Sequence, residues 1–195
     1  MMPTKLLHGA NVRLTACTHA DLPTITRWYE QTDFLRLLDA RAAYPQTEAA
    51  LSQWLEDQHK APDAFLFALR LLDSDEPLGY IELDGILWTQ QTGWLSIAIG
   101  DPAQRGKGYG YEALRLALAF AFHELNLHRL QLTVFSYNSN AIALYEKLGF
   151  QREGVYREFI QRDGRRYDMY LYGLLRREWE AQIGQAPFSD GNRGA

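Results

Sequence analysis

Cysteine is nearly absent from the sequence, with Cys17 the single example among 195 residues. One thiol cannot form an internal disulfide, which excludes the class of small secreted domains that are held together by disulfides. The first ten residues, MMPTKLLHGA, also lack the continuous apolar stretch of a signal peptide. These two absences predict a cytoplasmic protein.

Long apolar runs and an excess of positive charge are missing as well. No apolar run reaches the roughly 18 to 20 residues that a membrane helix requires. The chain carries 24 acidic and 20 basic side chains, for a net charge of −4. A general nucleic-acid binder needs a basic surface to contact phosphates. We therefore expect a soluble protein with no membrane and no nucleic-acid partner.

What the chain does contain is an ordinary globular composition, 47% hydrophobic and 23% charged. Its length allows one full hydrophobic core and is short for two. We expect a single domain over residues 1–183 and a flexible tail at 184–195, where the sequence becomes polar.

Hydrophobic periodicity and turn signals place the secondary structure. A capping box formed by Thr18 and Asp21 and a second cap at Thr47 each mark a helix start. Strands are predicted at residues 11–18, 64–72, 78–86, 93–99, 130–136, 152–161 and 165–174. Helices are predicted at residues 18–30, 47–60, 111–125 and 140–148. Residues 31–46 are predicted to be irregular.

The order of these elements predicts the fold class. Short connections among the three strands within residues 64–99 indicate an antiparallel meander. The helix at 111–125 lies between two strands, which requires one parallel pair. The sequence therefore predicts an α/β fold, with a mixed, mostly antiparallel sheet of about seven strands and helices on both faces.

A glycine-rich segment follows the strand at 93–99 and leads into the long helix. Glycine lets the backbone approach a ligand closely, and the free N–H groups at a helix start favour an anion such as a pyrophosphate. The segment matches neither the Walker loop nor the dinucleotide fingerprint. It retains the pattern Arg-x-x-Gly-x-Gly, and a turn without a ligand is the alternative. Its residues are Arg105, Gly106, Lys107, Gly108, Tyr109 and Gly110.

A second informative segment spans residues 138–150. Asn140 is the expected N-cap of its helix. Tyr145 falls on the apolar stripe, so its side chain is expected to face the sheet. A tyrosine that only packs in the core is the alternative interpretation.

Together the two segments resemble the GNAT superfamily of acetyltransferases, and the resemblance covers roughly residues 11–179. The family's second motif has the form Asn-x-x-Ala-x-x-x-Tyr-x-x-x-Gly-Phe, matched by Asn138, Ala141, Tyr145, Gly149 and Phe150. Residues 164–179 are similar to the branch that contains ribosomal-protein N-terminal acetyltransferases. The resemblance implies the GNAT fold, acetyl-coenzyme A as cosubstrate and an amine as acceptor.

The resemblance also implies roles for single residues. The backbone of Ile97, Ala98 and Ile99 is expected to pair with the pantetheine arm, and residues 105–110 to bind the pyrophosphate. Asn138 is expected to help fix the pantetheine. Tyr145 is expected to protonate the thiolate of coenzyme A as it leaves, after direct attack by the amine in a ternary complex.

The general base is less evident from the sequence. Trp94 stands where many relatives carry a glutamate, whereas Glu82 and Asp84 alternate along the preceding strand and face one side. Either carboxylate is a candidate acting through water, and a solvated strand face is the alternative. A site without an obvious base is easier to reconcile with an α-amine, since its pKa is near 8 rather than 10.4.

Several alternatives stay open at this point. An acyl-coenzyme A sensor without turnover is the main competing function. A protein N-terminus, an amino acid, a polyamine or an aminoglycoside could be the acceptor, and the protein could be a monomer or a homodimer. No metal is expected, because His123 and His128 are one residue too far apart for adjacent helical turns.

Overall fold

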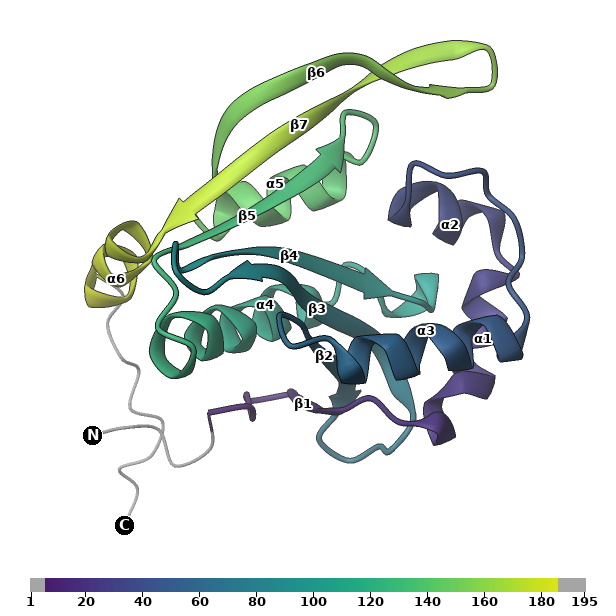
Figure 1. The fold of residues 1–195 in the computed structure, drawn as a ribbon, viewed down its shortest axis with the longest axis horizontal. Helices are drawn as coiled ribbons and strands as arrows, with labels where there is room; N and C mark the ends of the chain where they lie inside the picture. Colours follow the sequence, from purple (N-terminus) through teal and green to yellow (C-terminus); the bar gives the residue numbers. More distant parts are fainter. Residues whose placement is uncertain (1–5, 186–195) are drawn as a thin grey trace.

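A seven-stranded sheet organises the computed structural model, which describes residues 6–185 (Figure 1). The strand order is β1-β2-β3-β4-β5-β7-β6, with β4 and β5 parallel and every other neighbouring pair antiparallel. The strands are β1 (Val12–Ala16), β2 (Phe65–Leu71), β3 (Pro77–Leu87), β4 (Thr92–Ile99), β5 (Arg129–Phe135), β6 (Gln151–Arg162) and β7 (Arg165–Leu175). The predicted fold class is confirmed.

Helices pack on both faces of this sheet (Figure 1). They are α1 (Leu22–Tyr29), α2 (Thr32–Leu38), α3 (Glu48–Lys60), α4 (Tyr109–Ala119), α5 (Ser139–Lys147) and α6 (Arg176–Gln185). A short 3-10 helix (His19–Asp21) precedes α1, and a π-helical turn (Phe120–Glu124) continues α4. Within residues 6–185, no helix has both the length and the apolar character needed to cross a bilayer.

Alternation along β2 divides the core into two clusters. Phe67 and Leu69 face α4, whereas Leu66 and Ala68 face α1 and α3. All four side chains are buried, because helices cover the strand on both sides. The sheet is therefore a wall between two apolar layers, and any polar side chain on β3 or β4 that faces a layer is partly removed from water.

Three sequence-based predictions need correction or comment. The segment at 31–46 is not wholly irregular, because α2 forms within it and buries Phe34 and Leu35. The predicted N-cap Asn140 is wrong: Asn138 caps α5, and its Oδ1 accepts the N–H of Ala141 at 3.3 Å. Of the expected tail, residues 184 and 185 belong to α6, and 186–195 lie outside the described residues.

The parallel pair is unusually short. β4 pairs with β5 only from Thr92 to Trp94, whereas its pairing with β3 continues as far as Ile99. Beyond Trp94 the two parallel strands diverge, with β5 following β7 instead (Figure 1). The divergence leaves the main chain of β4 from residue 95 onward without a strand partner on that side.

A buried ion pair ties β2 to the start of α1. Nη2 of Arg70 donates to both carboxylate oxygens of Asp21, at 2.8 and 2.9 Å, and both residues are at least 92% buried. Nε of Arg70 donates to Oγ1 of Thr15 at 2.8 Å, and Asp21 also accepts the N–H of Thr18 at 2.8 Å. The predicted capping box is thus present, and its acid also neutralises a buried arginine.

Removing one partner of this pair should destabilise the fold strongly. Asp21→Asn keeps an oxygen for the Thr18 N–H but leaves the buried guanidinium of Arg70 uncompensated, so we expect the free energy of unfolding to fall by about 3–5 kcal/mol. Arg27→Ala, which breaks the exposed pair with Glu76, should cost less than about 1 kcal/mol. Denaturant unfolding of the two variants measures both, and equal losses would contradict the assignment.

Candidate active site

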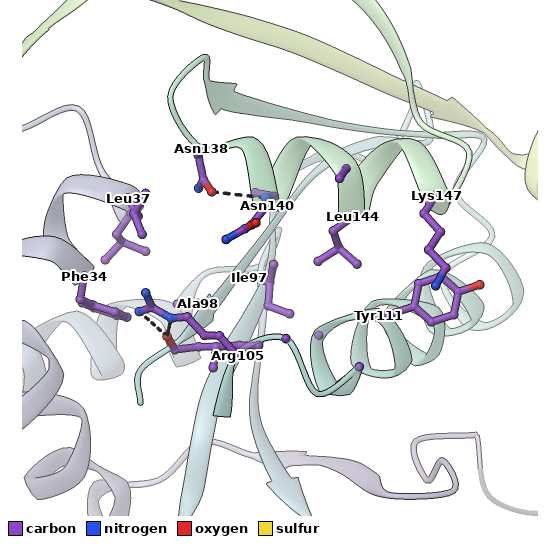
Figure 2. Close-up of a pocket in the computed structure, with 17 residues that line it drawn as sticks. Phe34, Leu37, Ile97, Ala98, Arg105, Tyr111, Asn138, Asn140, Leu144 and Lys147 are labelled. Atoms are coloured by element: carbon purple, nitrogen blue, oxygen red, sulfur yellow. Dashed lines mark hydrogen bonds between the residues drawn. The ribbon is translucent and has the colours of Figure 1, made fainter. Parts of the chain in front are cut away.

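A pocket of about 470 Å³ lies where β4 and β5 diverge (Figure 2). Four segments form its walls: the end of β4, the glycine-rich loop with the first turn of α4, helix α5, and helix α2. Its lining residues are Phe34, Leu37, Leu38, Ile97, Ala98, Ile99, Arg105, Gly106, Gly108, Gly110, Tyr111, Asn138, Asn140, Ala141, Ala143, Leu144 and Lys147. The largest part of this lining is apolar or glycine, with polar groups at a few positions.

The free edge of β4 forms one wall. Ile97, Ala98 and Ile99 line the pocket from a stretch that pairs with β3 but not with β5. Unpaired main-chain donors and acceptors at a strand edge bind extended amides in the way a further strand would. The pantetheine arm, which contains two amides in an extended chain, fits this edge chemically.

The glycine-rich loop forms the floor. Gly106 and Gly108 have φ values of +76° and +88°, and a Cβ built on either would meet no protein atom within 4 Å. Gly108 is also the N-cap of α4, so the N–H groups of the first helical turn are free to bind an anion. Both the open space above the glycines and the exposed donors fit a pyrophosphate.

Two further contacts fix the position of the loop. Nε and Nη2 of Arg105 donate to the carbonyl oxygen of Ile99, at 3.1 and 2.9 Å, which ties the loop to the end of β4 (Figure 2). A Cβ on Gly110 would lie 3.2 Å from Cδ1 of Ile99 and 3.5 Å from Cδ2 of Leu144. Glycine at 110 therefore lets α4 begin close to both β4 and α5.

The pocket brings together most of the residues predicted to bind the cofactor, but not all of them. Lys107 is exposed, and its Nζ donates to Oε1 of Gln104 at 3.0 Å. Tyr109, the first residue of α4, packs against the core. Neither side chain lines the pocket, because the loop turns them away from it. Asn138 does line it, and its use of Oδ1 as a helix cap leaves the side-chain NH₂ as a donor for a ligand.

Tyr145 lies behind the α5 wall. Its side chain is 6% exposed and its ring contacts that of Phe150 edge-on, with the centroids 5.9 Å apart. The pocket is lined by Leu144, the residue before Tyr145, and by Ala141, one helical turn before it. Tyr145 itself does not line the pocket. Burial raises the pKa of its phenol to about 12, so the group is protonated at every physiological pH. Its catalytic role stays a prediction.

Glu82 and Asp84 lie on β3, opposite Ser96 and Trp94 of β4. Oε2 of Glu82 accepts a hydrogen bond from Oγ of Ser96 at 3.1 Å. Burial raises the pKa of Glu82 to about 7, with the nearby charge of Asp84 adding to the effect and the Ser96 hydrogen bond opposing it. The pKa of Asp84 is also raised, by burial and then by the charge of Asp63.

Sequence reasoning missed the contribution of α2 and one contact at the far end of the pocket. Phe34, Leu37 and Leu38 reach the pocket from α2. The signal was present in the apolar residues of 34–38, but the helix was not predicted. At the other end, Nζ of Lys147 lies 4.6 Å from the ring centroid of Tyr111, so a cation and an aromatic face stand together at the rim (Figure 2).

Of the two histidines considered as metal ligands, His123 has another side-chain contact. The ring of His123 packs edge-on against Trp179, with the centroids 4.9 Å apart. Among residues 6–185 there is no group of three or more His, Cys, Asp or Glu side chains placed to hold a metal ion.

Comparison with known proteins agrees with this geometry. The family profile described as "Acetyltransferase (GNAT) domain" matches residues 11–151. An uncharacterized N-acetyltransferase of the SPbeta prophage of Bacillus subtilis is 32% identical over 90% of this chain and 96% of its own length. The [ribosomal protein uS5]-alanine N-acetyltransferase of Escherichia coli is 28% identical over 72% of this chain and 73% of its own length.

Among solved structures, the spermidine N-acetyltransferase of Vibrio cholerae in complex with CoA and spermine superposes with a TM-score of 0.80. It covers 88% of this chain and 99% of its own length at 24% identity, which establishes a common fold. The chain belongs to the GNAT acetyltransferase family. It is an N-acetyltransferase with acetyl-coenzyme A as cosubstrate, and the relatives lend no support to a sensor without turnover.

The loop glycines provide a direct test of the cofactor site. In Gly108→Ala the methyl group would project into the open space of the pocket, so we expect acetyl-coenzyme A to bind about tenfold more weakly, a change of about 1.4 kcal/mol. Gly164→Ala is the matched control, because Gly164 has a φ of +74° and equally open surroundings at the tip of the β6–β7 hairpin. Calorimetry on both folded variants compares them; unchanged affinity in Gly108→Ala would remove the loop from the site.

Proposed function

We propose that the protein transfers an acetyl group from acetyl-coenzyme A to an α-amine by direct attack within a ternary complex. The amine nitrogen forms a bond to the thioester carbon, the carbon–sulfur bond breaks, and coenzyme A leaves as a thiolate. Glu82 receives the proton that the amine loses, through water. Tyr145 supplies a proton to the sulfur.

The observation that carries this proposal is the position of Glu82, which is held by Ser96 beside the free edge of β4, together with a pKa that burial raises to about 7. A general base works best when its pKa lies near the working pH, and the free-energy cost of taking a proton grows with the pKa of the group that gives it. The pKa of Glu82, about 7, is roughly one unit below the pKa of an α-amine. It is more than three units below the pKa of a lysine or polyamine amine. An α-amine is therefore the acceptor whose proton this carboxylate can accept at the smaller free-energy cost.

The position of Glu82 supports the same role. It pairs with Ser96, which belongs to the part of β4 that has separated from β5. Ser96 and Ala98 lie two residues apart on the same face of the strand, and Ala98 lines the pocket. The hydrogen bond from Ser96 holds the carboxylate beside this free edge. A water molecule between them would complete the path from amine to base.

Tyr145 meets one requirement of the acid, because it has a proton to give; the proposal also requires the sulfur to come within hydrogen-bond distance of its hydroxyl, which lies behind the pocket wall. Its phenol keeps its proton near neutral pH because burial raises the pKa. The ordinary pKa of a cysteine thiol is near 8.5, below that of this phenol, so proton transfer to a leaving thiolate becomes easier if the developing negative charge lies against the phenol in a dry wall. Such a donor contributes typically 10²- to 10⁴-fold to a rate.

The names of the relatives give different acceptors, and one of these belongs to the proposed class of amine. The Escherichia coli relative is named for acetylation of an alanine of ribosomal protein uS5. The Vibrio cholerae neighbour is named for spermidine, but at 24% identity it shares only the fold. The first comparison supports an α-amine acceptor for this chain.

Removal of the Tyr145 hydroxyl should affect turnover and not cofactor binding. We expect Tyr145→Phe to lower kcat roughly 10- to 1,000-fold with an α-amine peptide, because the thiolate then leaves without a positioned proton donor. Tyr172→Phe is the control: its hydroxyl is also in the core but donates to Oε1 of Glu146 at 2.8 Å. If Tyr145→Phe retains full kcat, Tyr145 only packs in the core.

The pH dependence of kcat/KM should reveal the base. In the wild type two groups must lose a proton before reaction: Glu82, whose pKa is about 7, and the α-amine, whose pKa is near 8. Below pH 7, a plot of log kcat/KM against pH should therefore rise with a slope approaching two. In Glu82→Gln only the amine titrates, so the slope should fall to one. The value of kcat/KM near pH 8 should also fall, by roughly tenfold or more, because the base is missing. Asp84→Asn should keep the steeper slope.

A slope of one in the wild type would show that Glu82 is not the base. An independent check uses stability. Because burial raises the pKa of Glu82 in the folded state, its stabilising protonated form is lost as pH rises through about 7. Glu82→Gln should therefore gain stability relative to the wild type at pH 8 compared with pH 5, whatever the acceptor is.

A further inference from the structure

A second cavity, of about 440 Å³, adjoins the cofactor pocket. Leu37 and Arg105 line both, so the two spaces share one wall. The remaining lining residues come from α2, the segment between β5 and α5, and the tip of the β6–β7 hairpin: Asp33, Arg36, Tyr137, Arg162, Asp163 and Tyr167. A ligand in the second cavity would lie next to the cofactor pocket and in contact with α2.

The charged groups of this cavity fall into two sets. Arg36 is neutralised, since its Nη1 and Nη2 donate to the two carboxylate oxygens of Asp163 at 2.9 and 2.7 Å. Arg105 and Arg162 donate to main-chain carbonyl oxygens instead. Asp33 is the other carboxylate in the lining, which leaves two cations against one anion.

Of Arg105 and Arg162, Arg162 is the better candidate to bind an anion. Its Nη2 donates to the carbonyl oxygens of Asp39 and Arg41, at 3.0 and 3.1 Å. Its Nε is buried and has no hydrogen-bond partner within the described part of the chain. A neutral carbonyl satisfies a donor but does not cancel its charge, and a buried donor without a partner costs about 1–3 kcal/mol. A carboxylate, which accepts two parallel bonds from a guanidinium, would meet both demands.

We propose that this second cavity holds a carboxylate of the acceptor, with Arg162 as the residue that selects it. The acceptor is then an amine that also carries a carboxylate, either a free amino acid or a peptide with an acidic side chain near its N-terminus. This inference rests on the proposed function for the position of the reacting amine. The phenols of Tyr137 and Tyr167 form the rest of the wall beside the carboxylate.

The same charges exclude a polycation. A polyamine has no negative group to place against Arg105 and Arg162, and its ammonium groups would be repelled by the net positive charge of the lining. Selection of one substrate class against another is strongest when the wrong one brings like charges together. We therefore expect this chain to disfavour polyamines, unlike the structural neighbour that was solved with spermine.

The experiment compares acceptors in matched pairs. Alanine and alaninamide differ in the α-carboxylate, and the C-terminally amidated dipeptides Ala-Glu and Ala-Gln differ in a side-chain carboxylate. We expect the acid member of at least one pair to have a kcat/KM roughly tenfold or more above that of its neutral partner, mainly through KM. The pair that shows the preference identifies the source of the carboxylate.

Arg162 variants then assign the preference to this residue. Arg162→Gln should reduce the ratio between acid and neutral members to about one, and Arg162→Lys should restore part of it because the charge is retained. Arg157→Gln, at an exposed arginine of the same hairpin that lines neither cavity, should keep the wild-type ratio. A purely structural role of Arg162 would lower both members equally and would overturn the proposal.

The outcomes separate this inference from the proposed function. If the wild type acetylates all four α-amines without distinguishing acid from neutral, the α-amine function stands and the carboxylate site is wrong. If spermidine is acetylated in preference to every α-amine, the proposed function itself is wrong, and the carboxylate site with it.

Discussion

The separation of β4 from β5 after Trp94 is the constraint on which the site depends. Three paired positions hold the strands together, and beyond them the two halves of the sheet follow different neighbours. Had the ladder continued, the main chain of Ile97 to Ile99 would be used within the sheet and no pocket would exist beside it. The divergence exposes a backbone edge, makes room for α5 above it, and brings the glycine-rich loop below it. Sheet pairing is given up locally in exchange for a place where an extended ligand can substitute for a strand.

Local sequence patterns predicted much of the fold and of the candidate site, whereas features that depend on contacts between distant segments could not be predicted. The glycine-rich loop and the asparagine–tyrosine motif are local patterns, and most of their predicted residues line one pocket. The choice between Asn138 and Asn140 as N-cap was wrong because both lie at a plausible helix start, and only the backbone geometry distinguishes them. Lys107 and Tyr109 were predicted together with the rest of the loop, but their side chains do not line the pocket. The raised pKa of Glu82 and the second cavity depend on contacts between distant segments, which no local pattern records.

Glu82 illustrates a conflict between folding and reactivity. A carboxylate in the wall between two apolar layers loses hydration, which destabilises its charged form and raises its pKa. Glutamine at this position would avoid that cost, yet it could not accept a proton. The buried pair of Arg70 and Asp21 shows the opposite solution, in which a carboxylate is hydrogen-bonded to a guanidinium. Asp21 is thus paired with a cation, whereas Glu82 has a serine hydroxyl as its partner, and the proposed role of Glu82 as a base depends on that difference.

The hairpin of β6 and β7 returns to contact α2, through Arg36 with Asp163 and through Arg162 with the loop after α2. The two halves of the sheet are therefore joined twice, by rigid strand pairing at one end of the opening and by side chains at the other. Strand pairing resists stretching, whereas an ion pair with one partner 70% exposed is weak and screened by salt. Higher ionic strength is therefore expected to weaken the contact between the hairpin and α2 at the mouth of the site, and to leave the strand pairing at the other end unchanged.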